Sequence, residues 1–325
     1  MKARPAAQLA AAGALLALPF GLTDFWIFIA VEVLAFALYA VSFNVLLGYG
    51  GMLSFGHAAF LGVGGYTAAL VIKQSGLPAV LAFACLPFTA MFAAAAAALV
   101  IGFFSVRRTG IYFAMLTFAF QMLLYTVALK ATPLTGGDDG LTGLKPPGLL
   151  AQPLYYYYFA LAMTCVSLYV LYRIVSSPFG YALRALRANA LRVQYLGVNV
   201  RAHRLAAFVV SGAFAGLAGA IFALSNGNVF PGWLDWTASA TPVVMAVLGG
   251  TASFLGPAVG AAVYVVLEVL ISGRTEYWLL AMGIIMVIIV LLMPEGLTGL
   301  WRLGMVRRRV NANAAVAPLP TQGTT

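Results

Sequence analysis

Stretches of about 20 apolar residues recur along most of this 325-residue chain, and they limit its possible folds more than any other feature. A helix needs about 20 such residues to cross the roughly 30 Å hydrocarbon core of a bilayer. Charged residues make up only 8% of the chain, whereas soluble domains carry roughly 25%. So few charges cannot cover the outside of a soluble protein. The sequence therefore predicts an all-α integral membrane protein.

The limits of the apolar runs predict about ten transmembrane helices, within a range of eight to ten, and similar glycine clusters near 50–65 and 249–260 suggest two related halves. The segments 57–72 and 237–253 are short and glycine-rich, so either could be a re-entrant or broken helix. The run after Lys2 and Arg4 also resembles a signal peptide, but no small-residue cleavage site follows it. The expected spans are 6–22, 25–47, 57–72, 79–104, 111–130, 154–174, 205–225, 237–253, 255–272 and 276–294.

The distribution of basic residues predicts the orientation, because Lys and Arg near span ends accumulate on the cytoplasmic side. With ten spans and both termini in the cytoplasm, most of the 18 Lys and Arg residues fall on that side. Asp235 then lies outside, and Trp233 and Trp236 fit the outer interfacial belt. The net charge of +10 is thereby explained by topology, without a nucleic-acid partner.

Residues 1–305 are expected to form a single transmembrane domain, and 306–325 a disordered cytoplasmic tail. Cys85 and Cys165 lie in apolar runs without neighbouring ligands, so they are interpreted as small hydrophobic residues. No metal-ligand cluster, paired carboxylates or Ser/His/Asp set is apparent, which argues against a membrane-embedded enzyme. We expect no cofactor and no ATPase site, because the sequence contains no Gly-x-x-x-x-Gly-Lys-Ser/Thr loop.

The stretch from Tyr172 to Arg204, which includes the expected cytoplasmic loop at about 175–204, contains six arginines and no acidic residue. Its pattern predicts a short amphipathic helix that Gly197 ends or turns. This helix could lie in the headgroup plane of the bilayer, or it could dock on a cytoplasmic partner. The polar face holds Arg184, Arg187 and Arg192, and the opposite face holds Leu183, Leu186 and Leu191.

Glycine clusters near 50–65 and 249–260 allow close helix approach or helix breaks that face a polar solute. Ordinary tight packing explains any single glycine equally well, and a lone histidine such as His57 is more often a packed residue than a ligand. Placing the ionisable side chains of Glu32 and Glu268 within apolar spans is energetically costly, so we expect them to have a functional role. Pairing of Glu268 with Arg274 is the simpler alternative. The candidate translocation path comprises Asn44, Ser54, His57, Gly249 and Gly250.

Several segments occur in the order typical of one transporter family. They are Leu47–Thr67, Arg108–Phe120, Thr135–Gly143, Phe179–Ile221, Val247–Ala262 and Pro294–Gly299. Together they resemble the LivM-type permeases of the branched-chain amino acid ABC transporter family, over about residues 40–300. Two departures are Thr251-Ala252-Ser253 after the Gly-Gly pair and Asn189–Val193 in the coupling motif.

The resemblance implies a permease that imports branched-chain or related apolar amino acids across the bacterial inner membrane. It implies a second, homologous permease subunit, two cytoplasmic ATPase subunits and a periplasmic or lipid-anchored solute-binding protein. Urea or short amides are the alternative cargo, and an ion-coupled secondary transporter using Glu32 or Glu268 is the alternative mechanism. The residues implied in ATPase coupling are Phe179, Gly180, Arg184, Arg187, Asn189 and Gly197.

Overall fold

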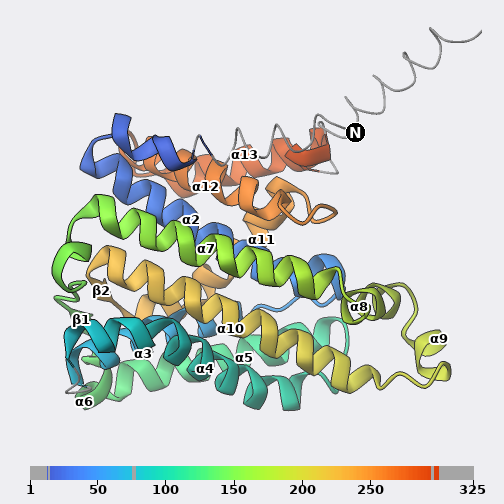
Figure 1. Ribbon diagram of the computed structural model, residues 1–325. Coiled ribbons are helices and arrows are strands. Elements are labelled where there is room, and N and C mark those ends of the chain that lie inside the picture. Colours follow the sequence, from blue (N-terminus) through green and yellow to red (C-terminus); the bar gives the residue numbers. More distant parts are fainter. Residues whose placement is uncertain (1–12, 14, 75–77, 294–295, 300–325) are drawn as a thin grey trace, which may run out of the picture.

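A bundle of helices that share a common direction forms the molecule (Figure 1). The structure is a computed structural model that describes residues 13, 15–74, 78–293 and 296–299. The short helices α8 (Pro178–Ala188) and α9 (Ala190–Tyr195) lie at one end of the bundle. The opposite end carries α6 (Thr132–Thr135) and a small antiparallel ribbon of β1 (Leu141–Thr142) and β2 (Asn228–Val229).

Five helices are long and apolar enough to cross a membrane. The first of them continues from α2 into a π-helical turn, η2 (Val45–Tyr49), and the others end within a few residues of the predicted spans. These helices confirm an all-α membrane fold. They are α2 (Asp24–Asn44) with η2, α4 (Ala79–Ser105), α5 (Ile111–Lys130), α7 (Pro153–Val175) and α10 (Val200–Asn226).

Four further helices are shorter or richer in glycine. They are α3 (His57–Gln74), α11 (Trp236–Gly249), α12 (Gly256–Ser272) and α13 (Trp278–Leu292). The connections between the helices contain the 3-10 turns η1 (Leu18–Gly21), η3 (Gly137–Asp139), η4 (Gly148–Ala151) and η5 (Pro231–Leu234). Most of the expected first span and all of the 306–325 tail lie outside the described residues. The number of spans, the side of the termini and the single-domain organisation therefore stay predictions.

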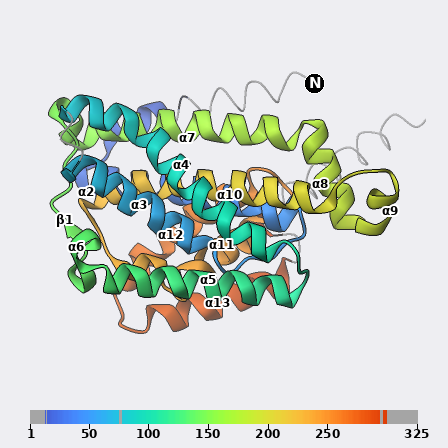
Figure 2. The ribbon, with the colours of Figure 1, turned by 90° about the horizontal axis from the view of Figure 1, so that it is seen from below.

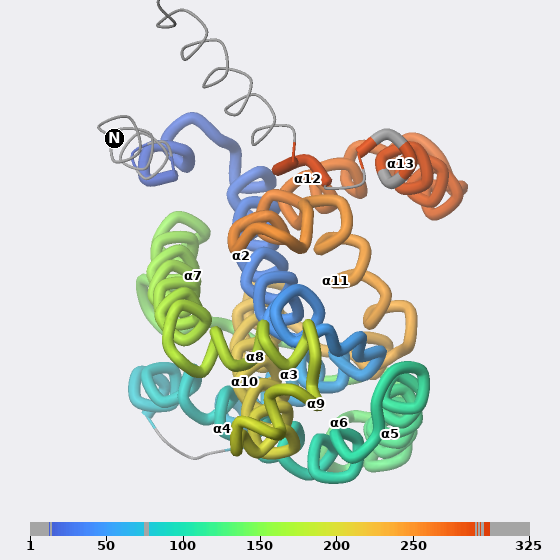
Figure 3. The backbone as a smooth tube through the Cα atoms, turned by 90° about the vertical axis from the view of Figure 1, so that its right-hand side faces the viewer, coloured from blue at the N-terminus to red at the C-terminus, as the bar shows by residue number. Residues whose placement is uncertain are grey.

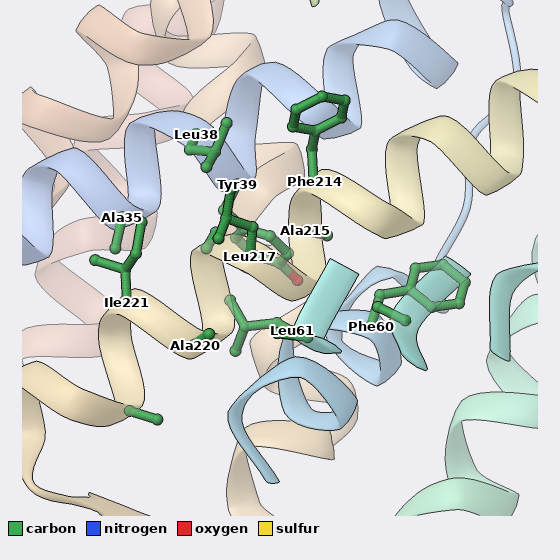
Figure 4. Packing of buried hydrophobic residues seen from close by; sticks show 14 of the residues in the cluster. Ala35, Leu38, Tyr39, Phe60, Leu61, Phe214, Ala215, Leu217, Ala220 and Ile221 are labelled. Carbon is green, nitrogen blue, oxygen red and sulfur yellow. The ribbon is translucent and has the colours of Figure 1, made fainter. Parts of the chain in front are cut away.

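Helix α10 lies at the centre of the bundle, packed against α2, α3 and α4. Figure 3, viewed from the end that carries α8 and α9, shows α4, α5, α7 and α13 at the periphery. Small residues allow the central helices to touch backbone to backbone: a Cβ atom at Gly64 of α3 would overlap the carbonyl oxygen of Gly216 in α10. Larger side chains fill the space on either side of this crossing, among them Leu38, Leu61 and Leu217 (Figure 4).

Helix α11 begins inside the bundle, in line with the broken-helix alternative for the segment 237–253. The Gln121 side chain, midway along α5, donates a hydrogen bond of 3.0 Å to the Leu234 carbonyl just before α11. Leu234 also lies directly against Gly62 of α3. Leu234 therefore lies level with the middle of α5, and the placement of Trp233, Asp235 and Trp236 at the outer interface stays a prediction. The 14 residues of α11 extend only about 21 Å, too short to cross a bilayer alone.

Candidate coupling and translocation site

The amphipathic helix expected in the arginine-rich loop is α8. Pro178 at its first turn favours helix initiation, because proline fixes φ and its missing N–H is not needed there. Leu183 and Leu186 are buried with 1% and 3% exposure, whereas Arg184 and Arg187 are exposed. Gly180 faces the preceding helix so closely that a Cβ atom would overlap the Val175 carbonyl oxygen. One face of α8 is thus fixed to the bundle.

The apolar face does not continue through Leu191, which is 67% exposed, contrary to the sequence expectation. Asn189 ends α8 in an extended conformation and caps α9, with its side chain accepting a 3.1 Å hydrogen bond from the Arg192 backbone N–H. The break changes which residues face the bundle, so Val193 is buried in place of Leu191. Gly197 follows α9 with φ of +86°, confirming the expected turn.

Arg184 and Arg187 contact the helix bundle as well as solvent. The Arg184 guanidinium donates a 3.0 Å hydrogen bond to the Val175 carbonyl and lies 5.2 Å from the ring centroid of Tyr49. Arg187 donates from Nη1 to the Gly48 carbonyl, and its Cγ lies against Gly51. The helix α8 is therefore attached to the end of α2 and to the glycine-rich segment that follows it.

Phe179 and His203 stack on each other, with ring centroids 5.7 Å apart and an interplanar angle of 15°. The Asn199 side chain caps the start of α10 by accepting a hydrogen bond from the Ala202 N–H. The stacking of Phe179 on His203 joins the first turn of α8 to the first turn of α10. It shows how Phe179, implied by the family resemblance, is held in the structure.

The end of α2 also contacts the loop between α11 and α12, which is distant in sequence. The buried Asn44 amide donates to the carbonyl oxygens of Thr251 and Ser253, each at 3.4 Å. Gly48 allows this approach, because a Cβ atom there would overlap the Asn44 side chain and crowd the Thr251 carbonyl. Two of the segments that carry the family resemblance, 47–67 and 247–262, are thus in direct contact.

A third such segment, near the end of the described chain, joins the same place. The Thr298 hydroxyl donates a 2.7 Å hydrogen bond to the Gly249 carbonyl and lies 3.1 Å from the Ser253 hydroxyl. Gly250 adopts φ of +100°, and a side chain there would be strained. A Cβ atom at Gly249 would overlap the Gly256 carbonyl, which closes the α11–α12 hairpin tightly.

His57 is fully buried at the start of α3 and packed among aromatic rings. Its Nε2 atom lies 3.1 Å from the Ser42 hydroxyl, which itself donates to the Tyr39 carbonyl. Since that hydroxyl has one proton, His57 is the donor, and its ring is protonated at Nε2. The ring stacks on Tyr39 with centroids 5.2 Å apart. These surroundings are those of a packed histidine, and a role in translocation stays a prediction.

Sequence reasoning missed a buried polar network at the starts of α3 and α11. The Ser239 hydroxyl donates 2.7 Å to the Gln121 side chain and accepts 3.0 Å from the Ala58 backbone N–H. The Thr117 hydroxyl similarly accepts from Phe55 N–H, two residues before α3, at 3.2 Å. Gln121, an amide inside an apolar span, was the signal that could have revealed it.

Ser54 lies in the segment between η2 and α3 and is fully buried. Its hydroxyl accepts a hydrogen bond of 3.2 Å from the Gly56 N–H. The candidate path residues therefore divide into two groups. Asn44, Gly249 and Gly250 lie at the junction with the α11–α12 loop, while Ser54 and His57 lie at the start of α3. Interrupted helices of this kind are typical of solute sites in transporters.

Glu32 of α2 and Glu268 of α12 line one cavity of about 380 Å³, together with Thr241 and Tyr264. Within the described residues no ion pair joins Glu268 to Arg274, so this alternative is not formed. No group of three or more His, Cys, Asp or Glu residues that could hold a metal occurs in the described part of the chain.

The chain matches the family model described as "Branched-chain amino acid transport system / permease component" over residues 25–290. The chain belongs to this permease family. It is 31% identical to the high-affinity branched-chain amino acid permease protein LivM of Escherichia coli K12, over 87% of this chain and 72% of that protein. The LivM protein of Salmonella typhimurium is 30% identical over the same shares.

A second permease of that type is also similar over a shorter part. The LivH protein of Salmonella typhimurium is 29% identical over 43% of this chain and 44% of its own length. No solved structure matches the chain. The family resemblance inferred from the order of the sequence motifs is confirmed. The family model covers the helices from α2 to α13.

Proposed function

We propose that this chain is the permease subunit of an ATP-driven importer that moves branched-chain amino acids across the bacterial inner membrane. The membership of the permease family carries this proposal. The sequence holds no nucleotide-binding Gly-x-x-x-x-Gly-Lys-Ser/Thr loop, so ATP hydrolysis would come from separate cytoplasmic subunits. A second, related permease and an external solute-binding protein would complete the importer.

The helices α8 and α9 are the contact to those ATPase subunits. They project beyond the ends of α4, α5 and α10 (Figure 2). The α9 segment exposes Leu191, Tyr195 and Leu196 at 67%, 89% and 82%. Apolar side chains exposed to this degree beside arginines are typical of a protein interface. We therefore assign the docking surface to α9, while α8 holds it on the bundle.

The contacts of α8 give a physical route from this surface to the membrane-embedded helices. Arg187 joins α8 to Gly48, and Asn44, one turn earlier in the same segment, joins it to the α11–α12 loop. A displacement of α8 is thus transmitted to α2 and to the hairpin at once. This is how ATP binding elsewhere would shift the permease between inward-open and outward-open states.

Purification of the tagged chain from its native membrane in mild detergent tests the assembly. Mass spectrometry should identify two ATPase subunits and a second permease. The isolated complex, reconstituted with its binding protein, should take up leucine, isoleucine and valine with ATP, and urea should not compete. Recovery of the chain alone, with uptake driven by an ion gradient, would contradict the proposal and favour the Glu32 and Glu268 alternative.

A further inference from the structure

A cavity of about 520 Å³ lies at the end of the bundle that carries α8. It is bordered by the segment after η2, the start of α5, the helix α8 and Arg204 near the start of α10. Arg108 lies in the connection between α4 and α5. Both of these helices are long and apolar enough to cross a membrane. The cavity is therefore at the level of the lipid headgroups, next to the ends of two spans.

Three arginines, Arg108, Arg187 and Arg204, line the cavity, and no acidic side chain does so among the described residues. Arg187 is held by the Gly48 carbonyl. The Nε atom of Arg204 is buried, and no hydrogen-bond acceptor reaches it within the described part of the chain. Buried polar groups are almost always hydrogen-bonded, so this donor is available to an acceptor that the described residues do not supply.

The start of α5 adds to this positive character. Gly110, with φ of +62°, directs the chain into the helix, which begins at Ile111. The first intrahelical hydrogen bond is donated by Ala114, so the N–H groups of residues 111–113 have no partner within the helix. Free N–H groups at a helix start favour an anion, and together with arginine side chains they suit a phosphate.

The other side of the cavity is apolar and open to the outside of the bundle. Ile111 and Met115 line it and are 74% and 59% exposed. They stand one turn apart on α5, a span of the membrane, with the arginines at its cytoplasmic end. A free phosphate would leave this apolar surface exposed, whereas the first methylene groups of an acyl chain would bury it.

We propose that this cavity binds the phosphate headgroup of an anionic phospholipid of the cytoplasmic leaflet, with Arg108 and Arg204 as its principal partners. The acyl chains would lie along Ile111 and Met115 of α5. Since Arg187 of the same cavity also holds α8, the bound lipid would support the base of the coupling helix. This inference needs the membrane topology of the family but not the identity of the transported solute.

Binding of phosphatidylglycerol to the purified complex, titrated by native mass spectrometry, tests the proposal. The double variant R108Q/R204Q should bind the lipid about tenfold more weakly, because charge-assisted hydrogen bonds to phosphate are lost. The matched control R107Q/R201Q removes the same charge from neighbouring exposed arginines that do not line the cavity. It should bind the lipid as the unchanged protein does.

Other outcomes identify other occupants and overturn the proposal. Equal weakening in both double variants would mean general charge attraction, and no weakening in either would mean that the cavity binds no lipid. Complete displacement by millimolar inorganic phosphate would indicate a free anion, and loss of the ATPase subunits with unchanged lipid binding would indicate a subunit contact. If R204Q prevents folding, R108Q alone retains the test, because the Arg108 side chain is exposed.

Discussion

Arg187 shows how one side chain can connect the cytoplasmic loop to the membrane domain. It is exposed, as an amphipathic pattern requires, yet its guanidinium also binds the Gly48 carbonyl at the end of α2. The family resemblance implies that Arg184 and Arg187 take part in ATPase coupling. Their hydrogen bonds within the chain show that they also position α8.

Replacing Arg187 by glutamine should reduce the amino acid uptake per ATP hydrolysed by about tenfold, because a hydrogen bond from a charged donor to the backbone is lost. Uptake and phosphate release in proteoliposomes measure this ratio. R173Q, which removes an exposed arginine at the end of α7, is the control and should leave the ratio unchanged. An unchanged ratio in R187Q would exclude Arg187 from coupling.

Gly64 offers a second test at the residue scale, because it lies directly against the Gly216 carbonyl. The change G64A should destabilise the protein by about 1–3 kcal/mol, the usual cost of overpacking, and lower its unfolding temperature in detergent. A Cβ atom at Gly283 of α13 would meet no other atom within 4 Å, so G283A is the matched control. Equal unfolding temperatures for both variants would contradict the close α3–α10 crossing.

At the scale of elements, the break between α8 and α9 determines which residues a partner can reach. Asn189 supplies the cap, and the break exposes Leu191 while it buries Val193. The two short helices therefore have separate roles, one attached to the bundle and one open to a partner.

The change L191D should lower the amount of ATPase subunit that co-purifies with the permease several-fold, because a carboxylate would have to lose its hydration in an apolar interface. Quantitative mass spectrometry of the purified complex measures this ratio. L149D changes an equally exposed leucine of η4 at the opposite end of the bundle and should leave the ratio unchanged. A complex that stays intact in L191D would place the docking surface elsewhere.

For the whole molecule, the two ends of the bundle are chemically different. The α8 and α9 end carries the arginine-rich loop, while the opposite end carries the Asp138-Asp139 turn and the β1–β2 ribbon. This difference predicts that the α9 end is cytoplasmic.

Single cysteines at positions 149 and 196 test the orientation, in a background with Cys85 and Cys165 replaced by alanine. A membrane-impermeant maleimide added to intact cells should label L149C, whereas L196C should react only after permeabilisation. Both leucines are strongly exposed, at 70% and 82%, so access to the thiol does not limit either reaction. The reverse pattern would invert the topology and with it the assignment of α9 to the ATPase side.

The sequence by itself determined the membrane class, most helix limits and the family, because about 20 apolar residues per span is a local requirement. The amphipathic α8 and the turn at Gly197 also followed from local pattern. The mid-bundle start of α11, the exposure of Leu191 and the junction of Asn44 with Thr251 depended on contacts between distant segments. Only the tertiary structure decided these features, because a small or polar residue in an apolar run does not indicate which neighbour it will meet.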